Sequence, residues 1–232
     1  MQRVGFSISG LPGSGSTTTG KDLAKVFGLP PPFYSGGVAR CLAEKRERMG
    51  EKALVAMQKG FLKAVIVDMM RTGEVPPRPN IAADYATFPR EFDLLIDEVQ
   101  QELLEHESTK VHEGRMVPHL VKRLQDEGRA ADKLFIKIFC IAEAEERIRR
   151  LQTREEYRGM TLDYVRQETE KRLAIERRRY QELYSVEDHI HLGHFDIIHD
   201  TTLFSPEEGL VELLRKVENL HPGLLAQFIP EK

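Results

Sequence analysis

Residues 10–17, GLPGSGST, have the spacing of a phosphate-binding loop. Gly10, Gly15 and Thr17 match the pattern GxxxxGK[ST], but Ser16 occupies the position of its lysine. Glycines in such a loop tolerate positive φ angles, which lets successive backbone N–H groups converge on phosphate oxygens. We expect the Thr17 hydroxyl to bind Mg²⁺. The residues expected to hold nucleotide phosphates are Gly10, Gly13, Ser14, Gly15, Ser16, Thr17 and Thr18.

The missing lysine is the feature of this loop that bears most on activity. In other proteins that lysine spans the β- and γ-phosphates and follows the charge of the transition state. Lys21 lies about 7.5 Å further along the helix axis and on another face, so it is a poor substitute. Either another cation reaches the phosphates, or the chain binds nucleotide with little or no turnover. A glycine turn that binds nothing is disfavoured by the strand before it and the helix after it.

Two charged helix faces downstream offer such cations. One, within residues 161–184, places three residues at i, i+4 and i+7: Arg172, Glu176 and Arg179. The other places three arginines at i, i+3 and i+7: Arg147, Arg150 and Arg154. A solvated stripe of salt bridges explains most such patterns. The upstream phosphate loop favours a functional interpretation, because phosphoryl transfer needs fixed cations around the phosphate oxygens.

The elements that must position these residues alternate between strand and helix. Strands are expected at residues 4–9, 109–113, 134–141 and 194–199, with a strand end near Tyr34. Helices are expected at residues 17–27, 38–48, 51–71, 91–105, 117–127, 143–153 and 161–184, and after Ser205. Prolines make residues 72–90 a long irregular connection. The pattern predicts an α/β fold of the P-loop NTPase type, with a parallel sheet between helices.

Composition narrows the class of protein. The 232 residues include 34 Lys and Arg against 37 Asp and Glu, a formal net charge of −3 that predicts neither a nucleic-acid nor a membrane partner. Residues 147–179, however, hold ten arginines and one lysine against six acids. Cys41 and Cys140 lack CxxC spacing, so both are expected to be core thiols in a reducing compartment. With no signal-peptide pattern or membrane span, the expected location is cytoplasmic.

Five motifs in order resemble the cytidylate kinases, most closely their short archaeal-type form. They are SISGLPGSGSTT at the phosphate loop, YSGGVAR at 34–40, VHEGR at 111–115, EKRLAIERRRYQELY at 170–184 and FDIIHDTTLFSPEE at 195–208. The resemblance covers nearly the whole chain. Its departures are Ser16, Glu176 where bacterial members often have aspartate, a longer region at 51–88, and an extension at 220–232.

The resemblance implies roles for individual residues. Ser35, Arg40 and Arg115 match positions at the phosphate of the acceptor nucleotide. Arg172 and Arg179 match phosphate-binding arginines, and Glu176 matches the carboxylate that holds the acceptor's ribose. Arg150 and Arg154 belong to helices that resemble a lid over the donor phosphates, and we expect them to act in catalysis with Arg172. Glu113 is expected either to orient Mg²⁺-bound water or to be a structural carboxylate.

The resemblance implies a single P-loop kinase domain that moves the γ-phosphoryl of ATP to CMP or dCMP with Mg²⁺. Its expected core comprises residues 1–34, 107–142 and 194–219, with a helical monophosphate-binding region at 35–106 and an arginine-rich helical lid at 143–193. The partners would be ATP and a pyrimidine monophosphate, and the oligomeric state is left open.

Three other functional classes share some features of the sequence. Ser16, the extra helix and the tail suit a nucleotide-binding pseudokinase with a regulatory or assembly role. A nucleic-acid binder is disfavoured because acids interleave with the arginines and no aromatic stacking pattern accompanies them. A zinc site is disfavoured because the spacing of four late histidines lacks the geometry of dependable sites. These are His189, His191, His194 and His199.

Overall fold

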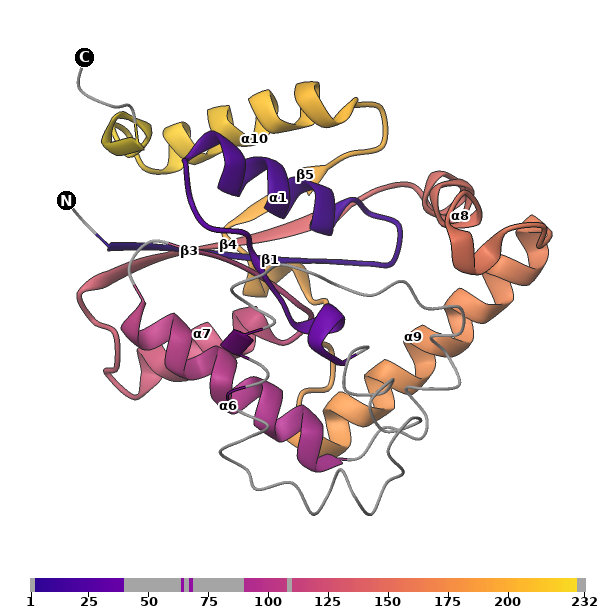
Figure 1. Ribbon diagram of the computed structural model, residues 1–232, viewed down its shortest axis with the longest axis horizontal. Helices are drawn as coiled ribbons and strands as arrows, with labels where there is room; N and C mark the ends of the chain where they lie inside the picture. Colours follow the sequence, from indigo (N-terminus) through magenta and orange to yellow (C-terminus); the bar gives the residue numbers. More distant parts are fainter. Residues whose placement is uncertain (1–2, 40–63, 65–66, 69–89, 108–109, 229–232) are drawn as a thin grey trace.

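The computed structural model describes residues 3–39, 64, 67–68, 90–107 and 110–228 (Figure 1). Its centre is a five-stranded sheet in the order β2-β3-β1-β4-β5, and every neighbouring pair is parallel. The strands are β1 (Arg3–Gly10), β2 (Phe33–Tyr34), β3 (Lys110–Glu113), β4 (Lys133–Ile141) and β5 (Ile197–Asp200). Helices cover both faces, so the predicted α/β fold is confirmed.

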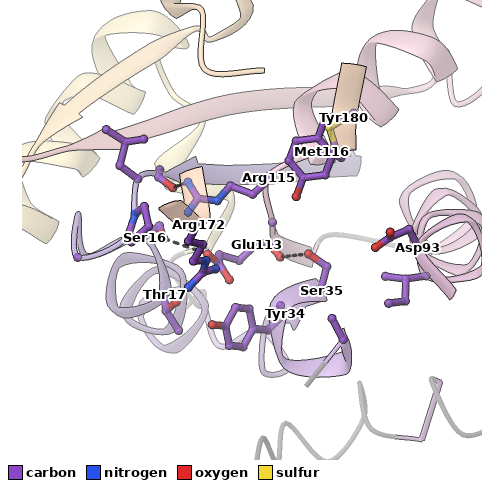
Figure 2. A pocket seen from close by; sticks show the side chains of 18 of the residues that line it. Ser16, Thr17, Tyr34, Ser35, Asp93, Glu113, Arg115, Met116, Arg172 and Tyr180 are labelled. Carbon is purple, nitrogen blue, oxygen red and sulfur yellow. Dashed lines mark hydrogen bonds between the residues drawn. The ribbon is translucent and has the colours of Figure 1, made fainter. Parts of the chain in front are cut away.

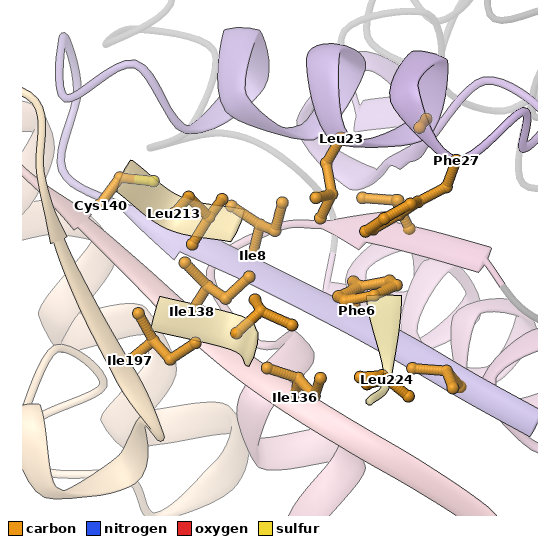
Figure 3. Packing of buried hydrophobic residues seen from close by; sticks show 14 residues of the cluster. Phe6, Ile8, Leu23, Phe27, Ile136, Ile138, Cys140, Ile197, Leu213 and Leu224 are labelled. Carbon is orange, nitrogen blue, oxygen red and sulfur yellow. The ribbon is translucent and has the colours of Figure 1, made fainter. Parts of the chain in front are cut away.

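One face of the sheet packs against α1 (Ser16–Val26) and α10 (Pro206–Leu220) (Figure 1). Alternate residues of β1 and β4 point into this layer, as the two-residue period of a strand requires. The buried side chains of the layer include Val4, Phe6, Ile8, Leu23, Ile136, Ile138, Cys140 and Leu213 (Figure 3). Burial raises the pKa of the Cys140 thiol to about 12, which makes it the predicted inert core thiol.

The segment after α10 belongs to the same core. Leu224 is buried, and the short helix η3 (Leu225–Phe228) brings the Phe228 ring to 4.2 Å from the Phe27 ring, measured between centroids. Burial of these apolar side chains is favourable by about 25 cal/mol per Å² of surface removed from water. The described part of the predicted extension therefore completes the layer that α1 and α10 form.

The opposite face packs against α6 (Arg90–His106) and α7 (Val117–Asp126) (Figure 1). Leu104 of α6 and Leu120 of α7 meet Phe135 of β4 in a second buried cluster. Because β4 is covered on both sides, its sequence is almost continuously apolar rather than alternating.

Two further helices lie beyond the carboxyl end of the sheet: α8 (Ala144–Gln152) and α9 (Leu162–Tyr184) (Figure 1). A small cluster of Ile148, Leu151 and Val165 joins them, with the 3-10 turn η1 (Glu155–Tyr157) between. Their other surfaces carry many ion pairs between exposed charges. Examples are Arg149–Glu146, Arg166–Glu145, Lys171–Glu168 and Arg178–Glu182. Much of the local positive charge of this region is thus neutralised on the helices themselves.

Element boundaries differ from the predicted ones mainly near the last strand. β5 begins at Ile197 rather than at residue 194, because the 3-10 turn η2 (Leu192–His194) occupies the chain just before it. The helix after Ser205 is confirmed, with a capping box in which the Ser205 hydroxyl accepts from the Glu208 amide. The prediction for Cys41 lies outside the described residues, as do most of the predicted helices at 38–48 and 51–71 and the connection at 72–89. No described helix is both long and apolar enough to cross a bilayer.

Acid pH is expected to destabilise the fold through its buried histidines. Burial and the charge of Lys216 lower the pKa of His199 to about 4 from 6.5. Between these pH values His199 binds a proton in the unfolded chain but not in the folded one. The free energy of unfolding therefore decreases as pH falls from 6.5 towards 4. For His199 the loss between pH 7.5 and 5 is about 2 kcal/mol. Urea unfolding at both pH values should show a smaller pH effect in His199→Gln, while His106→Gln, at an exposed site, leaves it unchanged. An equal pH effect in all three proteins would contradict this assignment.

Candidate active site

A cavity opens where the parallel strands end. Because carboxyl ends of parallel strands meet at one edge of the sheet, the segments after β1, β2 and β3 are brought together there. The cavity is walled by the phosphate loop, by the start of the helix at residues 35–39, by α6 and by α9 (Figure 2). Its lining includes these residues predicted from the sequence: Gly10, Gly13, Gly15, Ser16, Thr17, Thr18, Ser35, Arg115, Arg154 and Arg172.

The phosphate loop has the backbone shape that anion binding needs. Gly13 and Gly15 have φ angles of 80° and 84°, in the left-handed region that glycine adopts without strain. A Cβ atom at residue 13 would lie 2.5 Å from the carbonyl oxygen of Arg147, so the loop packs directly on α8. Ser14 is buried within the loop, where its amide donates to the Leu11 carbonyl at 3.0 Å. The loop therefore presents backbone amides rather than the Ser14 side chain.

Ser16, in the lysine position, is turned towards the end of β3. Its hydroxyl donates to Glu113 Oε1 at 2.9 Å (Figure 2). Ser35 is held nearby, since its hydroxyl donates to the Glu113 carbonyl at 3.3 Å. Thr17 and Glu113 thus offer a hydroxyl and a carboxylate beside the loop, which is the oxygen donor set that Mg²⁺ shares with nucleotide phosphates. These donors fit the ion.

A buried carboxylate fixes two arginines of the cavity. Glu176 is fully buried; Arg172 Nε lies 2.7 Å from its Oε1, and Arg115 Nε lies 3.4 Å from its Oε2. Burial alone raises the pKa of this carboxyl, but the two guanidinium groups outweigh it and hold the pKa below its usual range. The predicted residues Arg115, Arg172 and Glu176 are therefore brought together. Glu176 itself lies behind the cavity wall instead of in it.

The far wall of the cavity is acidic, a feature that the sequence reasoning missed. Asp93 and Asp97 of α6 line it together with Tyr184 of α9. Burial raises the pKa of Asp93 to about 6 although Arg179 donates to it at 2.5 Å. Burial raises the pKa of Asp97 to about 7 although the Tyr184 hydroxyl donates to it. The available signal was two acids four residues apart among the apolar positions of a predicted helix.

Arg150 lies on the other side of the phosphate loop. Its guanidinium donates to the Thr201 hydroxyl at 2.8 Å and to the Thr201 carbonyl at 2.7 Å. That hydroxyl in turn donates to the Ser14 carbonyl at 2.9 Å, so Arg150 braces the loop through Thr201. Here a second cavity of about 330 Å³ adjoins Gly15 and Thr18. Arg150 lines this second cavity and not the first.

The remaining predicted residues occupy separate positions. Arg179 is ion-paired with Asp93 at the edge of the acidic wall, and Arg154, half exposed, reaches the first cavity from the chain after α8. Arg40 lies outside the described residues. Within the described part of the chain, no group of three His, Cys, Asp or Glu side chains is arranged to hold a metal ion, the late histidines included.

Comparisons with known proteins agree on one family. A family model described as "Cytidylate kinase-like family" matches residues 6–202. The cytidylate kinase of Archaeoglobus fulgidus is 33% identical over 211 residues, 91% of this chain and 92% of that protein. The cytidylate kinase of Methanopyrus kandleri is 30% identical over 217 residues, 94% of each chain. A crystal structure of an uncharacterized protein from Eubacterium ventriosum has a TM-score of 0.57 at 13% identity, covers 93% of this chain and 99% of its own, and shares the fold alone.

Proposed function

The chain belongs to the cytidylate kinase-like family, and on that basis we propose that it transfers the γ-phosphoryl group of ATP to CMP or dCMP, giving CDP or dCDP. One observation carries the proposal. A single cavity has a phosphate loop with Arg115 and Arg172 on one side and Asp93 on the other (Figure 2). That polarity suits an acceptor whose phosphate points to the loop and whose base points to α6.

The mechanism that this geometry supports is in-line transfer without a covalent enzyme intermediate. The loop amides hold the donor phosphates, and Arg115, Arg154 and Arg172 neutralise the charge shared by donor and acceptor. Thr17 and Glu113 would hold Mg²⁺, which when bound would supply positive charge to the phosphate oxygens. The region at 143–193 acts as the lid that excludes water, which otherwise hydrolyses ATP. The region at 35–106, with Ser35 and Arg40, holds the acceptor. This region and the lid belong to one kinase domain.

The acidic wall supports a preference for cytosine. Above pH 7, where Asp97 is ionised, its carboxylate accepts a hydrogen bond from the exocyclic amino group of cytosine. The same oxygen repels the carbonyl oxygen that uracil carries in that place. We therefore propose that Asp97 and Tyr184 face the base of CMP, while the second cavity beside Gly15 and Thr18 accommodates the base of ATP.

A regulatory pseudokinase remains the second candidate function, because Ser16 donates to Glu113 and brings no positive charge to the loop. Such a protein would bind ATP and transfer nothing.

The experiment that tests the function is an acceptor panel. The protein is incubated with Mg·ATP and each of CMP, dCMP, UMP and AMP, and diphosphate products are separated by anion exchange. We expect CDP and dCDP, with much less UDP and ADP. A Gly13→Ala sample, in which the clash with the Arg147 carbonyl is expected to distort the phosphate loop, reports the activity of any contaminating kinase. ATP binding without product from any acceptor, in wild type and in Ser16→Lys, would instead support the pseudokinase.

A further inference from the structure

The phosphate loop carries no positive charge of its own, because residues 10–18 contain neither lysine nor arginine. The Ser16 hydroxyl donates its hydrogen bond to the Glu113 carboxylate. Lys21, the next cation along the chain, is exposed and does not line the cavity. If donor phosphates are to be neutralised in this cavity, the charge has to come from another element.

Arg115 provides a cation that is attached to the loop itself. It follows β3 by two residues, and its Nη1 donates to the carbonyl oxygen of Gly10, the first residue of the loop. Its Nε faces Glu176 at 3.4 Å, and its side chain is only 13% exposed. A guanidinium has five N–H donors, so these two contacts fix its plane and still leave donors for phosphate oxygens. In Figure 2 the side chain extends from β3 towards the loop and Ser16.

Arg115 is one of three guanidinium groups near the loop, and the carboxylates near it are those of Glu113 and Glu176. Glu176 is one carboxylate shared by Arg115 and Arg172. Arg147 adds a third guanidinium, whose Nη1 donates to the Pro12 carbonyl at 3.4 Å and whose pKa is lowered by burial and by the charge of Arg115. Cations that repel one another across the loop are stabilised by an anion bound between them. A polyphosphate at the loop is such an anion.

We propose that Arg115 takes the place of the missing loop lysine and contacts the donor phosphates during transfer. The inference rests on the proposed kinase function and deepens it, because the resemblance assigns this arginine to the acceptor. Two other arginines line the same cavity, Arg154 and Arg172. Arg154 is 44% exposed on the chain after α8, and Arg172 is carried by α9. Arg115 follows β3, which pairs with the strand that leads into the loop, and it donates to Gly10 at the start of the loop.

The proposed contact between Arg115 and the donor phosphates can be tested without turnover. The measurement is the affinity for the non-hydrolysable ATP analogue AMP-PNP, determined by calorimetry in the presence of Mg²⁺. Arg115→Gln retains a donor for the Gly10 carbonyl but removes the charge, and should weaken binding at least tenfold. Adding Ser16→Lys to that variant should recover most of the loss, because a lysine at residue 16 restores charge to the loop. Ser16→Lys alone should change the affinity less than threefold. Arg178→Ala, on α9 and 83% exposed, is the control and should bind as wild type does.

Two results would overturn the inference. In the first, Arg115→Gln binds AMP-PNP normally and only the KM for CMP rises, which assigns the residue to the acceptor. In the second, Ser16→Lys fails to rescue Arg115→Gln. If thermal denaturation shows that Arg115→Gln does not fold, Arg115→Lys replaces it in the test. Since it keeps the charge but not the planar set of donors, it should fold and lose less than tenfold in affinity, and a loss of tenfold or more would contradict the proposal. AMP-PNP binding needs no acceptor, so these outcomes stand even if the acceptor panel yields no product.

Discussion

Gly13→Ala should lower kcat/KM for CMP at least 100-fold, or about 2.7 kcal/mol of transition-state stabilisation. Its φ of 80° already costs an alanine about 1 kcal/mol. In addition, the new Cβ would lie 2.5 Å from the Arg147 carbonyl oxygen. That oxygen belongs to backbone and cannot rotate away, so either the loop or α8 must shift. In either case the backbone N–H groups of the loop no longer point together at the phosphate oxygens.

Gly128→Ala is the matched control for the loop variant. Gly128 also has a positive φ, 66°, but among the described residues no atom beyond its chain neighbours lies within 4 Å of the position its Cβ would take. It follows α7, away from the cavity lining. This variant should lose about 1 kcal/mol of stability and keep its kcat/KM. Steady-state kinetics and urea unfolding of both variants separate the steric effect from the cost of the backbone conformation. Equal kinetics in the two would refute the close packing of the loop on α8.

Arg172→Ala should lower kcat/KM for CMP at least tenfold, about 1.4 kcal/mol. The guanidinium lines the cavity and is held by Glu176 at 2.7 Å, so its charge is in place before substrate binds. Its removal leaves Glu176 buried with Arg115 as its remaining partner in this cluster. The loss of one of its two partners destabilises the fold by less than the ~3–5 kcal/mol typical of a buried charge left with no partner. Thermal unfolding should therefore also shift downwards.

Arg178→Ala on the same helix isolates the effect of location. Arg178 pairs with Glu182 at i, i+4, just as Arg172 pairs with Glu176, but the Arg178 pair is exposed. Exposed helical pairs contribute only about 0.3–0.5 kcal/mol, so this variant should match wild type in rate and stability. If Arg172→Ala were as active as Arg178→Ala, the assignment of Arg172 to the site would be wrong.

The fold could be predicted from the sequence because its signals are local. The apolar run at 134–141, the glycine-rich loop before a helix and the Ser205 cap each depend on neighbouring residues in the chain. The order of strands then follows from few possibilities, since crossovers between parallel strands have a fixed hand. The start of β5 was misjudged because the apolar pattern does not distinguish a 3-10 turn from strand.

Part of the candidate site was equally predictable. Ser16, Ser35, Arg115 and Arg172 lie in motifs, and strand ends bring such segments to one edge of a sheet. Helical spacing placed Arg172 and Glu176 on one face, but it did not show that Glu176 would be fully buried. Nor did it distinguish Arg150, which braces Thr201, from Arg154, which reaches the cavity.

The sequence by itself determined the family, the fold class and the absence of a lysine from the phosphate loop. Those properties depend only on residue types and on spacings of a few positions along the chain. Only the tertiary structure decided which cations meet the loop: Arg115, about a hundred residues away in the chain, is bonded to Gly10, while Lys21, eleven residues away, is not in the cavity. The physical reason is that parallel pairing of β1 with β3 brings Gly114 against Ile8, and no local periodicity encodes that contact.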